Sequence, residues 1–516
     1  MSDAMVLAVV APILAAVVSL LAGLWVDRSG WYVAVAACLL EVGLAVAVLL
    51  TVLAGGRTNY ELGGYVPPAG IELVADGLSA PVLVLVAAVS LAVLAYARRA
   101  GPRGNAFYTV YLLLVAGLAG VTLTGDIFNM YVFLEITGLA AYALVASGDS
   151  TRSAMASLKY LIVGTIGASL FLLGAGYAFV ATGTLNMVDL AERFAEVGYG
   201  SRLVLASFGL LVTGLLVKVA LFPVHSWQPD AYAFAPDSVS AYISALVSTV
   251  SAYAVARVLY TVFTLEFFAA VPLARSALVH AAAVSIIAGS ALAVVQSELK
   301  RMLAYSSVSQ FGMIVAAFAL ATESAAIGGV IHLLGHAVLK GGLFAAVGLV
   351  AYETGARTVD DYAGLAGRAP LAAGVVAVLG LALVGVPPAV GFVGKWYIAV
   401  GAVESGTWVV AAVILVSTVL TLAYVARVIE RMYFAEPPAP EREPTAAFTA
   451  LSSEEGASAS TDGGTRAGTA DTPERPVSYG MVAVVVLAAV AAVVLGFAAP
   501  AIEALLEPTL AEVFAP

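Results

Sequence analysis

The chain has 516 residues, of which 62% are hydrophobic and only 11% are charged, and its formal net charge is −10. Soluble domains carry about 25% charged residues, so this chain lacks the side chains to cover a water-facing surface and is expected to cross a membrane many times. The acidic balance argues against a nucleic acid partner. The single cysteine, Cys38, excludes disulfide bonds and cysteine-based zinc or iron–sulfur sites within the sequence.

Apolar segments long enough to span a bilayer recur along the chain. A membrane-spanning helix needs about 20 mostly apolar residues. Such segments lie at 4–24, 31–54, 77–97, 107–124, 126–147, 157–182, 203–225, 238–265, 276–296, 302–321, 325–352, 371–400, 407–433 and 480–499. The pattern predicts an all-α polytopic membrane protein with about fourteen transmembrane helices. Because an acidic rather than a basic start precedes the first segment, we expect a retained span and not a cleaved signal.

Two segments between the spans differ in composition. Residues 185–198, LNMVDLAERFAEVG, have the pattern of a short amphipathic helix at the membrane surface. The segment from Glu436 to Pro476 is rich in Pro, Gly, Ser, Thr and Glu and has no apolar periodicity, so it is predicted to be a disordered loop before the last span.

Basic residues are distributed unequally between alternate loops. Numbered from an outside N-terminus, the loops expected inside hold 15 Lys and Arg residues, and those expected outside hold 5. Positive charge favours the cytoplasmic side, so both termini are predicted to face out of the cell and the Glu436–Pro476 loop to lie in the cytoplasm. The acidity and the 5 lysines against 18 arginines resemble the composition of proteins from salt-loving prokaryotes.

Several ionisable residues fall inside the predicted spans, where a charge is costly unless it is paired or reaches water. They are Glu41, Glu135, Lys218, His332, His336, Lys340 and Lys395, with His225 and His280 as further candidates. One or two carboxylates cannot neutralise three lysines and a histidine pair, so the set as a whole indicates function. For Glu41 alone, a structural and a functional role remain equally open.

The sequence VIHLLGHAVLKGGLF places His332, His336 and Lys340 four residues apart, on one stripe of a helix. Two histidines on one helix face do not suit a haem. A zinc site is disfavoured because no third ligand is evident and the lysine would repel the ion. A row of groups that give and take protons favours a proton relay, and no metal or cofactor is expected.

Two predicted spans contain proline close to a lysine. Lys218 precedes Pro223 by five residues, whereas Lys395 follows Pro388 by seven. Because proline removes a backbone donor, both helices are expected to break, and irregular backbone at membrane depth is tolerated where it lines protein or water. The reversed order of lysine and proline indicates two repeats of inverted topology around an ion path.

Four segments carry a resemblance to a known family: GDIFNMYVFLEITGLAAYALV, ALFPVHSWQPDAYAFAPDSVSA, ELKRMLAYSSVSQFGMIV and HLLGHAVLKGGLF. They resemble, in order, the antiporter-like subunits shared by multisubunit Mrp-type Na⁺/H⁺ antiporters and respiratory complex I. In length, and in having no long lateral helix at its end, the chain is most similar to the D-type subunits of the Mrp antiporters. The resemblance implies two inverted five-helix repeats with broken helices. The expected divisions are N-terminal helices at 1–100, the repeats at 101–265 and 266–435, the loop at 436–476, and a last helix and tail at 477–516.

The resemblance also implies a polar axis of proton-carrying residues halfway across the membrane. Positions that match this axis are Glu135, Lys218, His332, His336, Lys340 and Lys395, while Lys159 and Lys300 match basic residues at helix starts. Glu135 is then expected to pair with Lys218 and to control whether the lysine keeps its proton. Thr249 stands where the family often has a lysine. Its hydroxyl is expected to orient water, although it cannot carry the charge.

Three functions remain open. The first is a proton-translocating subunit of a hetero-oligomeric antiporter that exchanges H⁺ for Na⁺. The second is the same module in a redox-driven pump of the complex I type, an NADH (or other donor):quinone oxidoreductase. The third is an inactive scaffold subunit, which Thr249 favours and the rest of the axis disfavours. A catalytic role for the chain itself is not expected, because no cofactor motif appears.

Overall fold

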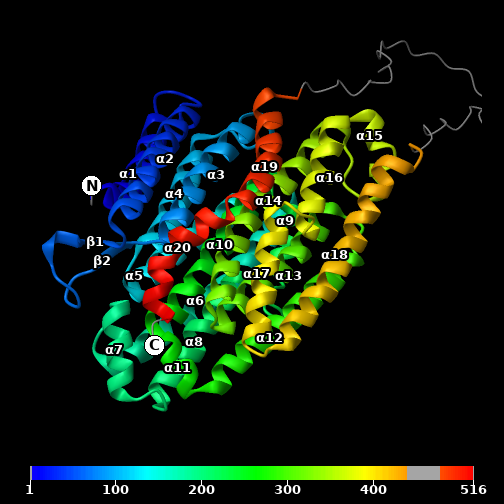
Figure 1. The fold of residues 1–516 in the computed structure, drawn as a ribbon. Helices are drawn as coiled ribbons and strands as arrows, with labels where there is room; N and C mark the ends of the chain where they lie inside the picture. Colours follow the sequence, from blue (N-terminus) through cyan, green and yellow to red (C-terminus); the bar gives the residue numbers. More distant parts are fainter. Residues whose placement is uncertain (1–2, 438–476, 515–516) are drawn as a thin grey trace, which may run out of the picture.

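A computed structural model of the chain describes residues 3–437 and 477–514. These residues form a bundle of helices with one small hairpin at its edge (Figure 1). Residues 438–476, which are all but the first two residues of the predicted Glu436–Pro476 loop, lie outside the described residues. The predicted disorder of this loop therefore stays a prediction.

Within residues 3–437 and 477–514, thirteen helical segments are long and apolar enough to cross a membrane. They are α1 (Asp3–Ala22), α2 (Gly30–Gly55), α3 (Ser79–Ala100), α4 (Asn105–Leu123), α5 (Ile127–Ala146), α6 (Thr151–Thr182), α8 (Arg202–Val219), α10 (Asp237–Arg257) with its continuation through η2 (Val258–Phe263) and α11 (Thr264–Ala270), α12 (Pro272–Val294), α13 (Leu299–Leu320), α14 (Glu323–Thr354), α18 (Trp408–Phe434) and α19 (Tyr479–Phe497). The predicted class, an all-α polytopic membrane protein, is confirmed.

The one predicted span that is missing from these thirteen, 371–400, consists of two short helices in the described chain, α16 (Pro370–Val384) and α17 (Val390–Glu404). The span predicted at 203–225 is too long, because α8 ends at Val219, four residues before Pro223. Both differences have one cause. The apolar sequence continues past the point where the helix ends, so hydropathy alone does not reveal the break.

The remaining elements are short. They are β1 (Thr58–Glu61), η1 (Leu62–Gly64), β2 (Glu72–Ala75), α7 (Met187–Val197), α9 (Gln228–Phe234), η3 (Asp360–Tyr362), α15 (Leu365–Arg368) and α20 (Ala499–Phe514). α7 confirms the surface helix predicted at 185–198, and its first turn is capped by Asn186, whose side chain accepts from two backbone N–H groups. The hairpin and α20 were not predicted.

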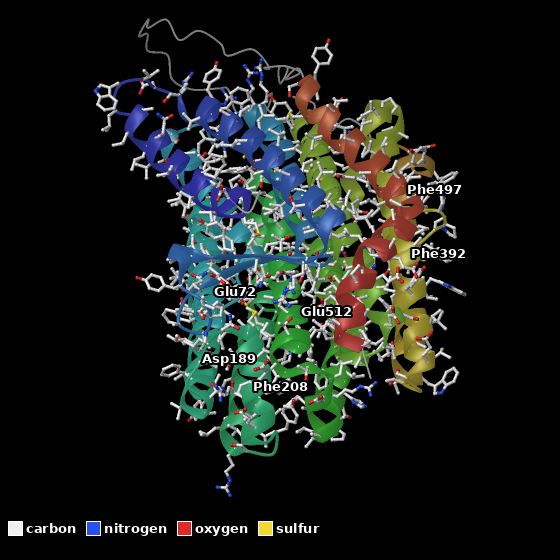
Figure 2. The ribbon with its side chains drawn as sticks, turned by 60° about the vertical axis from the view of Figure 1, so that its left-hand side comes forward. Glu72, Asp189, Phe208, Phe392, Phe497 and Glu512 are labelled. Carbon is white, nitrogen blue, oxygen red and sulfur yellow. The ribbon has the colours of Figure 1, made fainter. Side chains whose placement is uncertain are left out.

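The loops gather on two faces of the bundle. Figure 1 shows β1, β2, α7 and α11 on one side and α15 on the other. Strands β1 and β2 pair antiparallel from Thr58–Ala75 to Glu61–Glu72. Glu72 is buried (labelled in Figure 2), and its carboxylate accepts from Asn59 and from Asn186, the residue that caps α7. We call the side with β1, β2, α7, α11 and α20 the hairpin face, and the side with α15 the opposite face.

Helices α10, α13 and α14 form the centre of the molecule. Every residue of α10 from Ser238 to Arg257 is buried, and so are nearly all residues of α13 and most residues of α14. The sequence of α10, DSVSAYISALVSTVSAYAVAR, is rich in Ser and Ala, and small residues let neighbouring membrane helices approach closely. Peripheral helices such as α19 keep large apolar side chains exposed, among them Phe497 (Figure 2).

Candidate functional site

The break after α8 leaves Lys218 in the last helical turn, inside the bundle. Ala220 has a left-handed backbone (φ 65°) that ends the helix, and the chain becomes helical again only at Gln228. The indole of Trp227 donates to the carbonyl of Val217 at 2.9 Å, so a side chain from the break satisfies part of the interrupted helix end. The predicted break in this span is confirmed.

Lys218 is paired with Glu135 of α5. Its Nζ lies 2.9 Å from Glu135 Oε1 and 3.4 Å from the hydroxyl of Tyr142. Gly138 leaves room for the ammonium, because a Cβ there would lie 3.1 Å from Nζ. The side chain of Lys218 is 7% exposed and that of Glu135 is 21% exposed. The pair expected from the resemblance is therefore present, with the carboxylate as its more accessible member.

Thr249 lies in α10, which packs against both α8 and α14. It is fully buried, and its hydroxyl has no hydrogen-bond partner among the described residues. A free buried hydroxyl is the kind of group that ordered water satisfies in proteins. The position thus suits a residue that orients water.

A cluster of neutral polar groups stands next to Thr249 and was missed by the sequence analysis. Gln228, at the start of α9, donates to Ser248 and to the Tyr232 hydroxyl at 3.1 Å each, and Tyr232 and Ser248 lie 3.2 Å apart. The signal in the sequence was Gln228 itself, an amide three residues after the span predicted at 203–225.

The three stripe residues lie on one face of α14, as their spacing predicted, and this face packs on α13. His332 Nε2 lies 2.8 Å from Gln310 Oε1, while neither ring nitrogen of His336 has a partner in the described chain. Lys340 donates to the carbonyl of Leu303 at 2.8 Å and also contacts the hydroxyl of Ser306. All three stripe residues are buried.

Lys395 sits at the second break. It belongs to α17, and its Nζ donates to the carbonyls of Leu383 and Val384 at 2.9 Å each. These are the last carbonyls of α16, and a helix C-terminus carries partial negative charge that favours a cation. Gly394 permits close packing of α17 on α14, since a Cβ there would lie 2.7 Å from the Cβ of His332. The second predicted break is confirmed.

The helices that carry these residues are neighbours in the order of the predicted axis. α5 and α8 hold the Glu135–Lys218 pair, α8 packs on α10, α10 on α14, and α14 on α17. The structure thus places the six predicted residues and Thr249 on a continuous series of adjoining helices. Within the described residues, neither Lys340 nor Lys395 takes part in an ion pair.

Lys159 and Lys300 lie elsewhere, around the two ends of α9. Lys159 of α6 pairs with Asp230 at 2.7 Å, and Arg301 approaches the same carboxylate at 3.3 Å. Lys300 pairs with Asp237 at 2.9 Å. The two aspartates were missed by the sequence analysis. They stand seven residues apart in QPDAYAFAPDS, and nothing in that spacing shows which cations they meet.

The other candidates, Glu41, His225 and His280, form none of the contacts described above. Glu41 of α2 is fully buried, and neither carboxylate oxygen has a hydrogen-bond partner in the described residues. His280 of α12 is exposed and contacts the carbonyl of Ser276 at 2.7 Å. His225 lies in the break after α8, where its ring is 5.1 Å from that of Phe222.

A protein-family model matches more than half of the chain. Residues 124–421 match the family described as NADH:quinone oxidoreductase/Mrp antiporter, TM. The chain belongs to this family. The resemblance inferred from the four segments is therefore confirmed, and the matched range contains every residue of the proposed axis.

Relatives within the NADH:quinone oxidoreductase/Mrp antiporter family come from both of its branches. The chain is 45% identical to the NADH-quinone oxidoreductase N subunit of Desulforudis audaxviator (strain MP104C) over 80% of this chain and 82% of the relative. It is 32% identical to the Na(+)/H(+) antiporter D subunit of Bacillus subtilis (strain 168), over 77% and 80% respectively. A chain of the Mrp complex from Dietzia sp. DQ12-45-1b superimposes with a TM-score of 0.86 at 27% identity, covering 100% of this chain and 98% of that one.

Proposed function

We propose that this chain is the proton-translocating subunit of a multisubunit Na⁺/H⁺ antiporter in a prokaryotic plasma membrane. The observation that carries the proposal is the buried Glu135–Lys218 pair at a broken helix, from which adjoining helices lead to the α14 stripe and Lys395. The antiporter relative from Bacillus subtilis and the Mrp complex support an assembly with sister subunits. In this proposal the chain transports ions and carries out no redox chemistry of its own.

The pair works as a switch on Lys218. While Glu135 stays within 2.9 Å, it stabilises the charged ammonium. When the carboxylate moves away, an unpaired ammonium in a buried site becomes costly and releases its proton. Water held by Thr249 passes the proton toward His336 and Lys340 on α14. Lys395 receives it at the second break, where the carbonyls of α16 stabilise the positive charge.

The orientation follows from the basic residues. With 15 Lys and Arg on one set of loops and 5 on the other, the hairpin face lies outside the cell and the opposite face lies in the cytoplasm. Both termini then face outward. Lys159 and Lys300, paired with Asp230 and Asp237, orient water where the cytoplasmic side meets the axis. The acidic composition suits a salt-loving organism, for which sodium exchange is useful.

A redox-driven pump is the second candidate, and the 45% identity to an NADH-quinone oxidoreductase chain favours it. In that assembly the same axis moves protons, and energy comes from electron transfer in partner subunits. The residues of this chain serve both candidates equally well. A scaffold without transport is the third candidate, and the buried lysines Lys340 and Lys395, neither of which has a carboxylate partner among residues 3–437 and 477–514, speak against it.

Transport in lipid vesicles distinguishes the three candidates. The complex is purified with its sister subunits and reconstituted into vesicles that have accumulated protons, and the internal pH is followed with a pH-sensitive fluorophore. The antiporter predicts that a sodium pulse releases accumulated protons only when the sister subunits are present. Proton uptake driven by a quinone-reducing donor, with no response to sodium, would replace it with the redox pump. No response to either would support the scaffold.

A further inference from the structure

A cavity of about 430 Å³ opens on the hairpin face, between α7, η2 and α20. Unlike the apolar surface of the bundle, its wall carries ionisable side chains: Arg57, Asp76, Glu192, Arg257, Glu266 and Glu512. Charged walls suit water and hydrated ions and do not suit lipid chains. No residue of the proposed axis lines this cavity.

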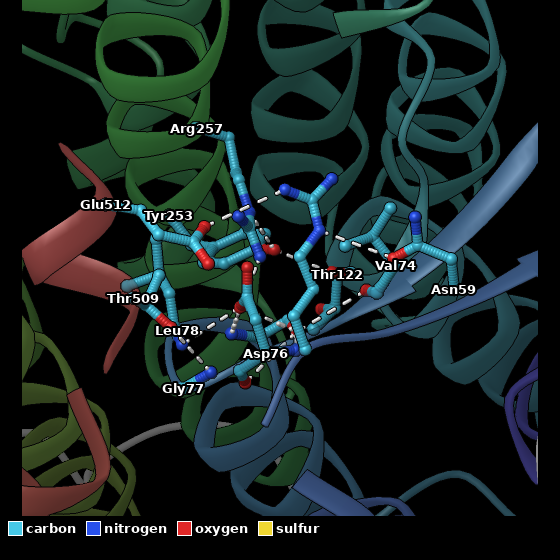
Figure 3. Close-up of polar contacts among 12 residues, drawn as sticks. Asn59, Val74, Asp76, Gly77, Leu78, Thr122, Tyr253, Arg257, Thr509 and Glu512 are labelled. Atoms are coloured by element: carbon cyan, nitrogen blue, oxygen red, sulfur yellow. Dashed lines mark hydrogen bonds and ion pairs between the residues drawn. The ribbon is translucent and has the colours of Figure 1, made fainter. Parts of the chain in front are cut away.

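Two of the residues that line the cavity, Asp76 and Arg257, form a buried ion pair, which we call the floor of the cavity; Figure 3 shows its contacts. Arg257, the last residue of α10, donates to Asp76 Oδ1 at 2.6 Å and to the hydroxyl of Tyr253 at 2.7 Å. The side chains of Arg257 and Asp76 are 8% and 4% exposed. A second pair, Arg57 with Glu512 of α20, is longer at 3.9 Å and more exposed. The Asp76–Arg257 pair is thus the shorter and more deeply buried of the two ion pairs that line the cavity.

The floor is connected to the centre of the molecule by one face of α10. Thr249, Tyr253 and Arg257 follow each other at intervals of four residues, so they lie along a single stripe of this helix. The hydroxyl of Thr249 at the inner end has no hydrogen-bond partner in the described part of the chain, and Tyr253 in the middle donates to the carbonyl of Thr122 at 2.7 Å. The stripe therefore runs from the axis to the cavity.

The backbone beyond Arg257 is irregular. Residues Val258–Phe263 form a π-helix, and Thr264 has φ 63°. A π-helical turn inside an α-helix is frequently found at functional sites. The irregular segment forms part of the cavity wall through Tyr260 and Thr261, so the wall and the helix that carries the stripe are one continuous element.

We propose that this cavity is a water-filled vestibule that connects the proton axis to the hairpin face, with the Asp76–Arg257 pair as its gate. The ligands of the vestibule are water and the hydrated proton. The guanidinium at the floor remains charged and repels sodium, and its displacement from Asp76 and Tyr253 admits water to Thr249. This inference rests on the proposed function, because the vestibule serves the axis.

The alternative is that the cluster only fastens the end of α10 to α3. Asp76 also accepts from the backbone N–H groups of Leu78 and Ser79 at the start of α3, so the carboxylate has a structural part in any case. A structural clamp requires no access from water to Thr261, and modification of the cavity wall would then leave transport unchanged.

Cysteine labelling in the assembled complex tests the vestibule. In a Cys38→Ala background, Thr261→Cys places a thiol in the wall, and Glu196→Cys places one on the exposed side of α7, outside the cavity. Both are expected to react with a membrane-impermeant maleimide from the same side, and only the adduct at Thr261 is expected to abolish proton flux. An unreactive Thr261→Cys, or a full flux after its modification, would overturn the proposal.

The gate is tested by a thiol deeper in the stripe. Thr249→Cys is expected to resist a small charged thiol reagent while Arg257 is intact, and to react when Arg257→Lys removes the forked contact with Asp76 and Tyr253. Equal reactivity in both backgrounds would contradict the gate. The reactivity of the cysteine is measured independently of transport. An absence of sodium exchange in the unlabelled complex would therefore count against the proposed function and not against the vestibule.

Discussion

Lys340 and Lys395 are held by backbone carbonyls rather than by carboxylates. Lys340 contacts the carbonyl of Leu303, and Lys395 contacts those of Leu383 and Val384. A neutral carbonyl stabilises an ammonium less than a full negative charge does. Their contacts within the described residues therefore stabilise the protonated form of these lysines less than Glu135 stabilises that of Lys218. A lysine that can lose and regain its proton suits the end of a proton path that receives the proton.

His336 is the residue on the α14 stripe with no polar contact of its own in the described chain. Its ring meets the ring of Phe311, with centroids 4.8 Å apart. Because removal of this imidazole breaks no hydrogen bond among the described residues, His336→Ala is expected to assemble at normal yield and to lose most proton flux. His280→Ala, an exposed histidine on α12, serves as the matched control. A stable His336→Ala complex with normal flux would show that the stripe is not a relay.

Glu41 is a carboxyl group with nothing to accept from or donate to in the described chain. A buried polar group without a partner costs about 1–3 kcal/mol, and α2 packs mainly on α1, α3 and α4, which carry no residue of the axis. Glu41→Leu is therefore expected to raise the thermal unfolding midpoint of the complex and to leave ion exchange unchanged, with Glu41→Gln intermediate in stability. If exchange falls in both variants while stability holds, Glu41 has a functional role.

At the scale of the elements, ion pairs fix the starts of the central helices. Asp237 begins α10 and pairs with Lys300 in the first turn of α13, with side chains 18% and 5% exposed. Removing one partner of a buried pair typically costs about 3–5 kcal/mol. Asp237→Asn is thus expected to lower the unfolding midpoint of the complex clearly. Asp360→Asn, whose pair with Arg431 is largely exposed, is expected to have almost no effect. Equal midpoints for the two variants would contradict this assignment.

The elements themselves could be predicted from hydropathy, whereas their contacts could not. Long apolar runs identify the spans, and the amphipathic pattern at 185–198 identified α7. The end of α8 at Val219 depends on a left-handed residue, Ala220, that no composition rule marks. The partners Asp230 and Asp237 are set by how α6, α9 and α13 meet, so only the fold reveals which cation each carboxylate receives.

At the scale of the whole molecule, alternate loops gather on two faces. The unequal number of Lys and Arg residues in these loops therefore predicts which face lies in the cytoplasm, and labelling tests this orientation. Glu196 of α7 is exposed on the hairpin face, and Asp360 is exposed on the opposite face. In a Cys38→Ala background, Glu196→Cys is expected to react with an impermeant maleimide on intact cells, and Asp360→Cys only after permeabilisation. The reverse pattern would invert the proposed topology.

The axis was only partly visible in the sequence. The buried charges and both breaks could be predicted because ionisable residues and prolines are rare inside apolar spans. The pairing of Glu135 with Lys218 came from the resemblance, and the structure places the two charged groups 2.9 Å apart. The Gln228–Tyr232–Ser248 cluster was not predicted, because neutral polar side chains are common in membrane helices. The Asp76–Arg257 pair was not predicted either, because charged residues near the ends of membrane helices are common and do not stand out in the sequence.

The central claim is that Glu135 controls the proton on Lys218, and ion exchange in Glu135→Gln tests it most directly. Complex yield and sodium-dependent proton efflux are measured for Glu135→Gln and for the double variant Glu135→Gln, Lys218→Met. Control of the lysine proton by Glu135 predicts normal assembly and no exchange in both, because the amide cannot stabilise the ammonium as the carboxylate does. A purely structural pair would instead destabilise the single variant by about 3–5 kcal/mol and recover in the double variant. Wild-type efflux in Glu135→Gln would contradict the claim.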